Sequence, residues 1–174
     1  MNPADRRSRP TGSLKSCEWT LHCGDLDRKD VQELLAFHVM QLRGSSPADA
    51  CHVLPADRLR APEVTFWSLR EDGRLLAIGA LKELSSAEGE RKSMRTAPHA
   101  LRRGAGAAIL RAITAEARRR GYARLCLETG STAEFGPALA FYRRNGFEPC
   151  GPFAAYRPTP FTRFLSKTLD AGRG

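Results

Sequence analysis

A basic, glycine-rich stretch, "LRRGAGAAIL", begins at Leu101 and leads directly into an alanine-rich segment. Glycine and alanine leave the backbone of such a turn almost bare, so a ligand can approach its main chain closely. The first turn of a helix has about four N–H groups without internal partners and carries partial positive charge, which favours a phosphate group. We therefore predict an anion-binding loop made of Arg102, Arg103, Gly104, Ala105, Gly106 and Ala107. Close packing of a helix start against a sheet is the alternative that the spacing alone leaves open.

The spacing of this loop does not fit two widespread phosphate-binding motifs. No GxGxxG opens onto the helix with an acidic residue about twenty positions further on at a strand end, as a dinucleotide-binding fold requires. The chain also has no GKS or GKT sequence, which a nucleoside-triphosphate loop of the Walker type needs.

The loop lies within a chain that alternates strand-like and helix-like segments. A turn at residues 71–73 joins two strands within residues 63–84, and prolines restrict residues 46–62 to a loop with short helical turns. The apolar periodicity predicts further strands over residues 17–23, 90–96, 123–129 and 160–169, and helices over residues 31–42, 105–120 and 136–147. The first helix presents a stripe of Val31, Leu34, Leu35, His38, Val39 and Leu42.

This order of elements predicts an α/β (α+β) fold. The sheet is expected to be antiparallel at first and to gain a parallel strand across the helix at 105–120. We expect one domain over residues 16–170, a disordered basic arm over residues 1–15 and a flexible tail over residues 171–174.

The net charge of +9 would suit a nucleic-acid partner, but it is confined to two segments. Residues 1–16 carry +3 and residues 102–124 carry +6, so the rest of the chain is neutral overall. No aromatic stacking set or DNA-binding motif accompanies the arginine-rich helix. We therefore expect no nucleic-acid partner.

The cysteine spacing bears on metal binding and redox state, and the hydropathy pattern bears on membrane insertion and location. The five cysteines are scattered, without a CxxC pair or a spacing that suits zinc, which predicts reduced thiols and no metal site. No apolar run approaches the roughly 18 residues of a membrane span, and the first 13 residues lack the apolar core of a signal peptide. We expect a soluble cytoplasmic protein that has no membrane partner.

Three blocks taken together resemble the GNAT superfamily of N-acetyltransferases: "KSMRTAPHALRRGAGAAILRAI", "GYARLCLETG" and "ALAFYRRNGF". They cover residues 90–147, and the similar order of elements extends over residues 16–169. Within the superfamily, the segments "FWSL", "GALKEL", "KSMRT", "LETGS" and "CGPFAAY" resemble a group of small bacterial acetyltransferases of the YsnE type. The resemblance implies a mixed, mostly antiparallel sheet with helices on both faces and a splayed parallel strand pair at the cofactor site.

The resemblance also implies roles for single residues. Met94, Arg95 and Thr96 would offer strand main chain to the pantetheine arm and the acetyl carbonyl of acetyl-CoA, and the loop at residues 102–107 would hold its pyrophosphate. Tyr142, four residues before a glycine, would be the general acid that protonates the departing thiolate. A tyrosine packed in the core with a satisfied hydroxyl is the alternative.

The sequence departs from the family pattern at two positions. Leu101 occupies the place of the arginine or glutamine that opens the family's loop, which leaves the adjoining arginines to do more. Phe135 stands where the family often has an asparagine, seven residues before the tyrosine, so one expected pantetheine contact is in question.

An acceptor amine must lose a proton before it attacks a thioester, so the resemblance calls for a base near the sulfur. Glu128, at the end of the strand at 123–129, is the candidate base or ammonium anchor, with Glu90 or a water chain as the rival. A structural carboxylate that caps nearby N–H groups is the other interpretation of Glu128.

Four further residues could contribute to the acceptor side. Arg95 could hold a substrate carboxylate, although a strand-end arginine is often simply solvated. His52 and His99 fall in loops, where surface or packed histidines are the common case, and Tyr156 could shape the acceptor pocket.

The sequence therefore predicts an acetyl-CoA-dependent N-acetyltransferase that acts by direct transfer on a primary amine of a small molecule, without a metal. Acetylation of a protein or peptide amine is the nearest alternative, followed by a non-catalytic acyl-CoA sensor or a nucleic-acid-binding module. The sequence leaves open which amine is used and whether the chain forms a homodimer.

Overall fold

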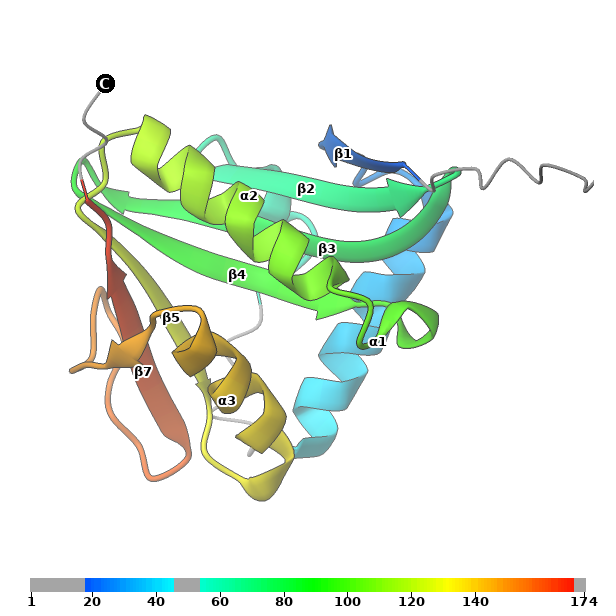
Figure 1. Ribbon diagram of the computed structural model, residues 1–174. Coiled ribbons are helices and arrows are strands. Elements are labelled where there is room, and N and C mark those ends of the chain that lie inside the picture. Colours follow the sequence, from blue (N-terminus) through cyan, green and yellow to red (C-terminus); the bar gives the residue numbers. More distant parts are fainter. Residues whose placement is uncertain (1–17, 46–53, 171–174) are drawn as a thin grey trace, which may run out of the picture.

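The computed structural model describes residues 18–45 and 54–170 (Figure 1). The predicted arm at residues 1–15, the tail at residues 171–174 and the candidate His52 lie outside the described residues. The described chain forms one seven-stranded sheet with the strand order β1-β2-β3-β4-β5-β7-β6. The strands are β1 (Trp19–Cys23), β2 (Val64–Glu71), β3 (Arg74–Ser85), β4 (Glu88–Thr96), β5 (Arg124–Gly130), β6 (Glu148–Pro149) and β7 (Thr162–Thr168).

All neighbouring strands are antiparallel except β4 and β5, which run parallel. The parallel register covers only three pairs, Glu88 with Arg124, Gly89 with Leu125 and Glu90 with Cys126. Beyond them each strand keeps its other neighbour, since β4 continues along β3 and β5 continues along β7. The predicted mixed sheet with a splayed parallel pair is therefore confirmed.

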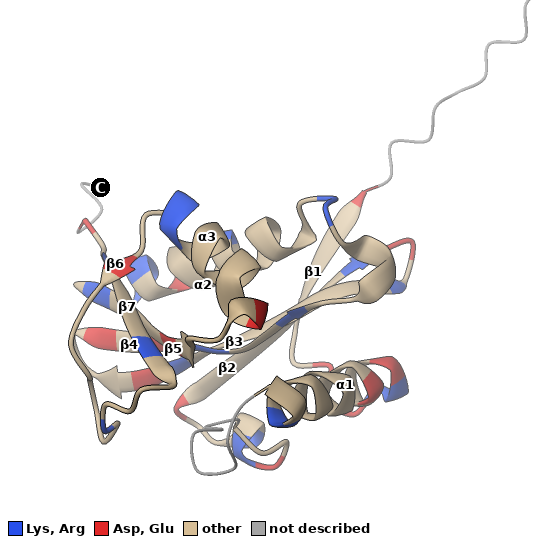
Figure 2. Ribbon diagram, turned by 90° about the horizontal axis from the view of Figure 1, so that it is seen from below, with Lys and Arg blue, Asp and Glu red and all other residues tan. Residues whose placement is uncertain are grey.

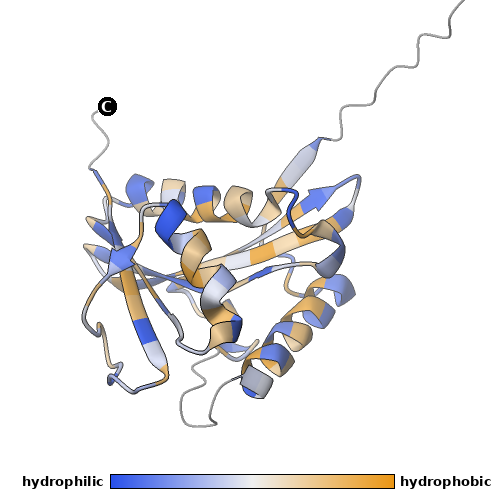
Figure 3. Cartoon of the chain, turned by 60° about the horizontal axis from the view of Figure 1, so that its bottom comes forward, coloured by the Kyte–Doolittle hydropathy of each residue, from blue (hydrophilic) through white to orange (hydrophobic). Residues whose placement is uncertain are grey.

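Three α-helices cover the sheet: α1 (Lys29–Ser45), α2 (Ala105–Arg119) and α3 (Gly136–Arg144). Figure 2 shows α1 below the sheet and both α2 and α3 above it, so helices lie on both faces as expected. Short 3₁₀ turns occupy Arg58–Arg60 (η2), Pro98–Ala100 (η3) and Ala133–Phe135 (η4). The apolar face of α2 is buried against the sheet, with Ile109, Ile113 and Ala117 fully inaccessible. Figure 3 shows the hydrophobic colouring of the central strands on which these helices pack.

The β2–β3 hairpin follows directly from its sequence. Glu71 pairs with Arg74, so Asp72 and Gly73 form a two-residue turn, and both have positive φ (48° and 80°). Asp-Gly is a favoured pair for such a turn, because its backbone twist matches that of the flanking strands. The turn was therefore predictable from three residues.

A β-bulge in β4 was not predicted. Ile78 pairs with Arg95 and Ala80 pairs with Lys92, so Gly79 of β3 faces both Ser93 and Met94. Ser93 has a φ of 46°, which lies in the left-handed region. An extra residue of this kind bends its strand and redirects the side chains that follow. The bulge lies where β4 has already left β5.

Two other features also differ from the sequence-based expectation. The two-residue strand β6 was missed, because so short a segment has no periodicity to detect. Strand β1 was predicted from its alternation, yet four of its five residues are exposed because it is the edge strand of the sheet.

Arg70 of β2 ties the sheet to the start of α1. Its guanidinium is almost fully buried and donates to Asp25 Oδ2 at 3.0 Å and to Asp30 Oδ2 at 2.6 Å. The hydrogen bonds from Ser68 and then Arg70 lower the pKa of Asp25, and those from Arg70 lower the pKa of Asp30. This ion-pair cluster fixes where α1 begins and hence which of its residues reach the centre of the sheet.

We predict that Arg70→Met lowers the free energy of unfolding by about 3 kcal/mol, because the substitution leaves two partly buried carboxylates without their cation. Urea unfolding at neutral pH measures the change. Arg74→Met, at an exposed position of the same hairpin, is the matched control and should change stability by no more than about 0.5 kcal/mol. Equal effects of the two substitutions would contradict the assigned role of Arg70.

Candidate active site

A cavity of about 430 Å³ lies where β4 and β5 separate. Residues of α1 line it from one face of the sheet and residues of η4 and α3 line it from the other, so it passes through the gap between the two strands. Its walls comprise His38, Gln41, Leu42, Ser45, Leu54, Arg91, Lys92, Ser93, Met94, Arg95, Glu128, Thr129, Gly130, Glu134, Phe135, Ala138 and Tyr142. A pocket at a strand divergence of this kind is a natural ligand site.

Tyr142 of α3 is 5% exposed and lines this cavity. Its hydroxyl lies 3.9 Å from the sulfur of Met94 on β4, a weak acceptor. The guanidinium of Arg91 stands 4.8 Å from the ring centroid, and Phe147 packs edge-on at 5.7 Å. The ring is therefore fixed by packing, while its hydroxyl points to the strand that the sequence assigned to the acetyl group.

Glu128 of β5 also lines the cavity and is half-buried. Its backbone carbonyl accepts a hydrogen bond of 3.4 Å from the Arg91 guanidinium. Its carboxylate contributes to the electrostatic field at Lys92 and Tyr156. The structure thus brings Glu128, Tyr142, Met94 and Arg95 to one cavity.

Glu90, the rival base, is not among the residues that line the cavity. It is 2% exposed and accepts a hydrogen bond of 2.6 Å from the Tyr156 hydroxyl, and Lys92 Nζ lies 3.3 Å from the same oxygen. Tyr156 in turn accepts a hydrogen bond of 2.7 Å from Lys92 Nζ. Burial and the Glu90 charge raise the pKa of Tyr156, and burial lowers the pKa of Lys92 against the opposing effect of Glu90. Glu90 and Tyr156, which lie outside the cavity lining, therefore hold the side chain of Lys92 in place at the cavity wall.

His38 of α1 reaches the same cavity from the opposite face of the sheet. It is 7% exposed, and its Nδ1 makes no hydrogen bond with the described residues. Burial, together with the positive charges of Arg95, Arg91 and Lys92, lowers the pKa of His38 to about 3. The imidazole is therefore neutral at physiological pH, and it lies within the field of all three cations.

The predicted anion-binding loop lies between η3 and α2. Arg102 and Gly104 both have positive φ (60° and 88°), and Gly104 is the N-cap of α2. No side chain caps this helix start, so the first N–H groups of a 15-residue helix remain available to a ligand. Leu101 is 59% exposed, and Arg102 is exposed as well.

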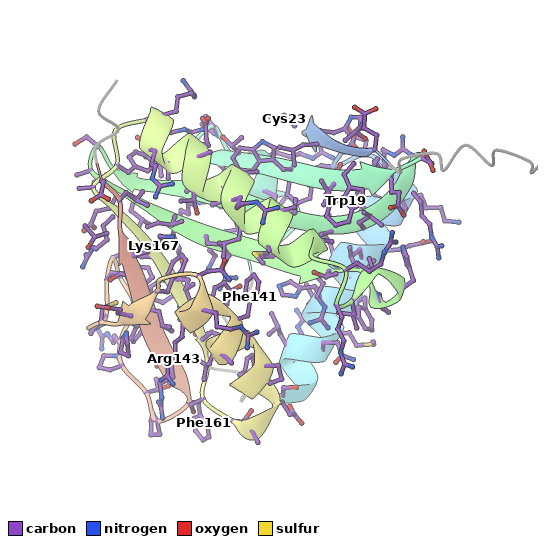
Figure 4. All side chains as sticks on the ribbon, viewed as in Figure 1. Trp19, Cys23, Phe141, Arg143, Phe161 and Lys167 are labelled. Atoms are coloured by element: carbon purple, nitrogen blue, oxygen red, sulfur yellow. The ribbon has the colours of Figure 1, made fainter. Side chains whose placement is uncertain are left out.

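The backbone at Gly106 approaches strand β4 closely. A Cβ at this position would lie 3.0 Å from Thr96 Oγ1 and 3.7 Å from Met94 Cε. The aromatic rings of Trp19 and Phe141, both labelled in Figure 4, flank the loop near Gly104 and Gly106 respectively. Small residues at this helix start therefore allow the loop to meet the end of β4, so the close-packing alternative also has a physical basis.

The side chain of Arg103 pairs with a carboxylate of the protein, whereas the predicted loop would have used it to bind an anion. Its guanidinium donates to both oxygens of Glu71, at 2.6 and 2.8 Å, and Trp19 Nε1 donates to the same carboxylate at 2.9 Å. The Arg103 side chain therefore ties the loop to the end of β2, whereas its main chain stays in the loop.

The site residues inferred from sequence fall into two adjoining groups. Met94, Arg95, Glu128 and Tyr142 line the cavity, and residues 102–107 form the loop, with Thr96 at the junction of the two. Phe135 lines the cavity with its ring packed on Gly130. His99 is exposed in η3 and does not line the cavity.

His38, Arg91 and Lys92 are among the cavity residues that were not predicted from the sequence. His38 stood within the apolar stripe of the first helix, where a polar residue among leucines was the one available indication. Nothing in the sequence indicated that Arg91 and Lys92 would lie at the cavity, because strand alternation cannot reveal the bulge that follows them.

Comparison with known proteins decides the family. A model of the acetyltransferase (GNAT) domain matches residues 62–149, about half of the chain. This chain belongs to the GNAT acetyltransferase family. YedL of Escherichia coli (strain K12), an uncharacterized N-acetyltransferase, is 47% identical over 151 residues, which span 87% of this chain and 95% of that protein. The predictions of an acyltransferase and of the GNAT superfamily are therefore confirmed.

The finer resemblance and the fold agree with this assignment. YsnE of Bacillus subtilis (strain 168), another uncharacterized N-acetyltransferase, is 45% identical over 83% of this chain and 96% of that protein. A crystal structure described as an acyl-CoA N-acyltransferase from Klebsiella pneumoniae subsp. pneumoniae superposes with a TM-score of 0.69 at 27% identity, over 88% of this chain and 99% of that one. The GNAT protein is thus of the YsnE type, as the sequence segments indicated.

The described part of this acetyltransferase has neither a metal cluster nor a helix that could cross a membrane. Within residues 18–45 and 54–170, no three His, Cys, Asp or Glu side chains gather as a metal site would require. The helices described there are too short or too polar to cross a bilayer.

We predict that His38 makes the acetyltransferase less stable in mild acid. The unfolded chain binds a proton at this residue below about pH 6.5, whereas the folded chain does not until about pH 3, so stability is full above pH 6.5 and declines as pH falls. Between pH 6.5 and 4.5 the wild type should lose about 2 kcal/mol more than His38→Gln. Urea unfolding at both pH values measures the difference, and equal losses would show that His38 titrates normally in the folded protein.

Proposed function

We propose that the protein transfers the acetyl group of acetyl-CoA directly to a primary amine of a small molecule. One observation carries the proposal: the Tyr142 hydroxyl and Glu128 line a single cavity at the divergence of β4 and β5, beside an uncapped helix start. The cavity supplies an acid and a base, and the helix start supplies donors for a phosphate.

The residues at the loop fit the phosphate end of acetyl-CoA. Uncapped N–H groups, the partial positive charge of α2 and the exposed Arg102 favour a pyrophosphate. A GNAT family acetyltransferase from Elizabethkingia anophelis has acetyl-CoA bound in its crystal structure and shares this fold (TM-score 0.64, 13% identity, 87% of this chain and 98% of that chain). Acetyl-CoA would supply the activated thioester, and β4 would offer the main chain of residues 94–96 beside it.

Tyr142 is the proposed general acid. Its hydroxyl has only the weak Met94 sulfur as a partner within the described residues, so its proton can be given to a departing thiolate. The Arg91 guanidinium over its ring adds positive charge where negative charge would develop.

Glu128 is the proposed base or ammonium anchor. It lines the cavity, whereas the rival Glu90 is held by Tyr156 and Lys92 behind the wall. A carboxylate at the cavity can accept the amine proton directly or through water. We therefore favour Glu128 over Glu90.

Direct transfer is favoured over a covalent acetyl-enzyme. Cys126 is the described thiol nearest to Glu128 in sequence, and burial raises its pKa to about 12. A thiol with such a pKa stays protonated and is a poor nucleophile. Positioning of the amine and the field of the cavity would then supply most of the rate.

The arginine-rich end of α2 supports no competing nucleic-acid function. Arg119 and Arg120 both donate to the carboxylate of Glu116, and Arg120 also donates to Thr65. These hydrogen bonds lower the pKa of Glu116 to about 2. We therefore assign these two arginines to the helix end rather than to a phosphate backbone.

We predict that Tyr142→Phe lowers kcat about 100-fold and leaves the Kd for acetyl-CoA within about twofold, because only the acid is lost. A thiol-release assay against an amine panel measures kcat, and calorimetry measures Kd. Tyr122→Phe is the control, since that buried tyrosine donates to Glu83 away from the cavity. Full turnover in Tyr142→Phe would remove the proposed acid, and no cofactor binding at millimolar acetyl-CoA would refute the function itself.

We also predict that Arg102→Gln raises the Kd for acetyl-CoA about tenfold, an effect that added salt should diminish. Arg118→Gln changes an exposed arginine at the opposite end of the same helix and should leave Kd unchanged. Calorimetric titrations at two salt concentrations measure both variants. Equal Kd values for the two would show that the loop does not bind the cofactor's phosphates.

A further inference from the structure

Strand β4 brings three cationic residues to the cavity wall: Arg91, Lys92 and Arg95. The bulge at Ser93 and Met94 puts Lys92 and Arg95 on the same face of the strand, since their partners Ala80 and Ile78 lie two residues apart. Arg91 lines the cavity from the other face, where it contacts Tyr142 of α3. All three charges act on the same neutral imidazole of His38, which shows that they converge on one region. Their ionic partners within the protein differ.

Lys92 already has its counter-charge. Its ammonium lies 3.3 Å from Glu90 and donates to Tyr156, and Glu128 adds a second favourable charge. It therefore requires no further anion.

Arg95 has no carboxylate partner within residues 18–45 and 54–170. Its guanidinium lies 5.0 Å from the ring centroid of Phe37 on α1, and burial lowers its pKa. Stacking on an aromatic ring orients a guanidinium and leaves its N–H edge free to bind a planar anion. The cavity therefore exposes an oriented, ionically unpaired arginine.

Arg91 also lacks a carboxylate partner among the described residues, and it contacts the proposed acid, Tyr142. It is 8% exposed, contacts the carbonyl of Glu128 at 3.4 Å and the ring of Tyr142, and finds no carboxylate among the described residues. Its Nε is buried without a hydrogen-bond partner. Arg91 is buried and Arg95 is half-buried. A cation that is withdrawn from water without a counter-ion is unfavourable, so the two together at one cavity indicate an anion that arrives with the ligand.

The position of Arg95 separates this anion from the cofactor's phosphates. Arg95 stacks on α1, below the sheet in Figure 2, whereas the phosphate-binding loop lies at the start of α2 above it. His38 lies on the α1 side as well and, being neutral, offers a hydrogen bond without competing for charge. The acceptor would enter from this side.

We propose that the acceptor is an amine that also carries a carboxylate, and that Arg95 binds this carboxylate while Arg91 and His38 lie beside it. The proposal rests on the proposed acetyl transfer and names the class of its substrate: amino acids and similar amino carboxylates. Arg95 then selects the substrate, Glu128 receives the amine proton and Tyr142 faces the leaving thiolate.

The test compares acceptors in matched pairs, each an amino acid and the amine that lacks only its carboxylate. For the wild type we expect kcat/KM to be at least about tenfold higher for the amino acid of a productive pair, as a charge-assisted ion pair allows. In Arg95→Gln this preference should fall to within about threefold through KM, with kcat little changed. Arg95→Lys should retain part of it, and Arg111→Gln, an exposed arginine of α2, should retain all of it.

Two outcomes would overturn the proposal while acetyl transfer stands: equal use of both members of every pair by the wild type, or an undiminished preference in Arg95→Gln. A raised Kd for acetyl-CoA in Arg95→Gln would assign the arginine to the cofactor instead. Failure of the proposed function is recognised separately, because the wild type would then not bind acetyl-CoA in the absence of an acceptor.

A second readout does not depend on turnover. We expect N-acetyl amino acids, added to the CoA-loaded protein, to shift the His38 ring resonances in NMR spectra of the wild type but not of Arg95→Gln. The corresponding N-acetyl amines without a carboxylate should shift them only weakly. Absence of any shift with millimolar N-acetyl amino acids of varied side chain would contradict the carboxylate site even if no productive acceptor were found.

Discussion

Strands β4 and β5 remain hydrogen-bonded for three residue pairs and then diverge. Each diverging segment has a partner strand on one edge only, so the backbone groups of the other edge face the gap. Polar backbone groups cannot remain buried without partners, which makes the gap a place for a ligand rather than for packed side chains. The cavity, the bulge of β4 and the placement of α1 and α3 on opposite faces of the gap all depend on this one separation.

The separation also determines the electrostatics of the site. The cavity that opens between the strands is lined by Arg91, Lys92 and Arg95 of β4. Lys92 is neutralised from behind by Glu90, and α1 contributes a neutral His38 because the Arg70 cluster fixes the start of that helix. The net result is a cavity whose fixed charge on the α1 side is positive.

Much of the fold was predictable, because it follows from local rules. Asp72-Gly73 identified the hairpin, the stripe of Ile109, Ile113 and Ala117 identified α2, and the strand after Gly121 required a parallel crossover. The bulge was not predictable, since nothing in "RKSMRT" indicates that one residue will be left unpaired. The position of His38 close to three cations was also not predictable, for a related reason. It depends on the tertiary distance between α1 and β4, which neither element's own periodicity contains.

The same geometry bears on how an acceptor would be prepared for reaction. An amine enters in water as an ammonium, and a cavity with excess positive charge favours its loss of a proton. The cations that would repel a simple ammonium would attract an amino carboxylate, whose anionic end compensates for its cationic end. Glu128 of β5 then provides one negative site in the same cavity, to which the amine end can be directed. Selection of the acceptor and its deprotonation would thus follow from one arrangement of charges along the diverging strands.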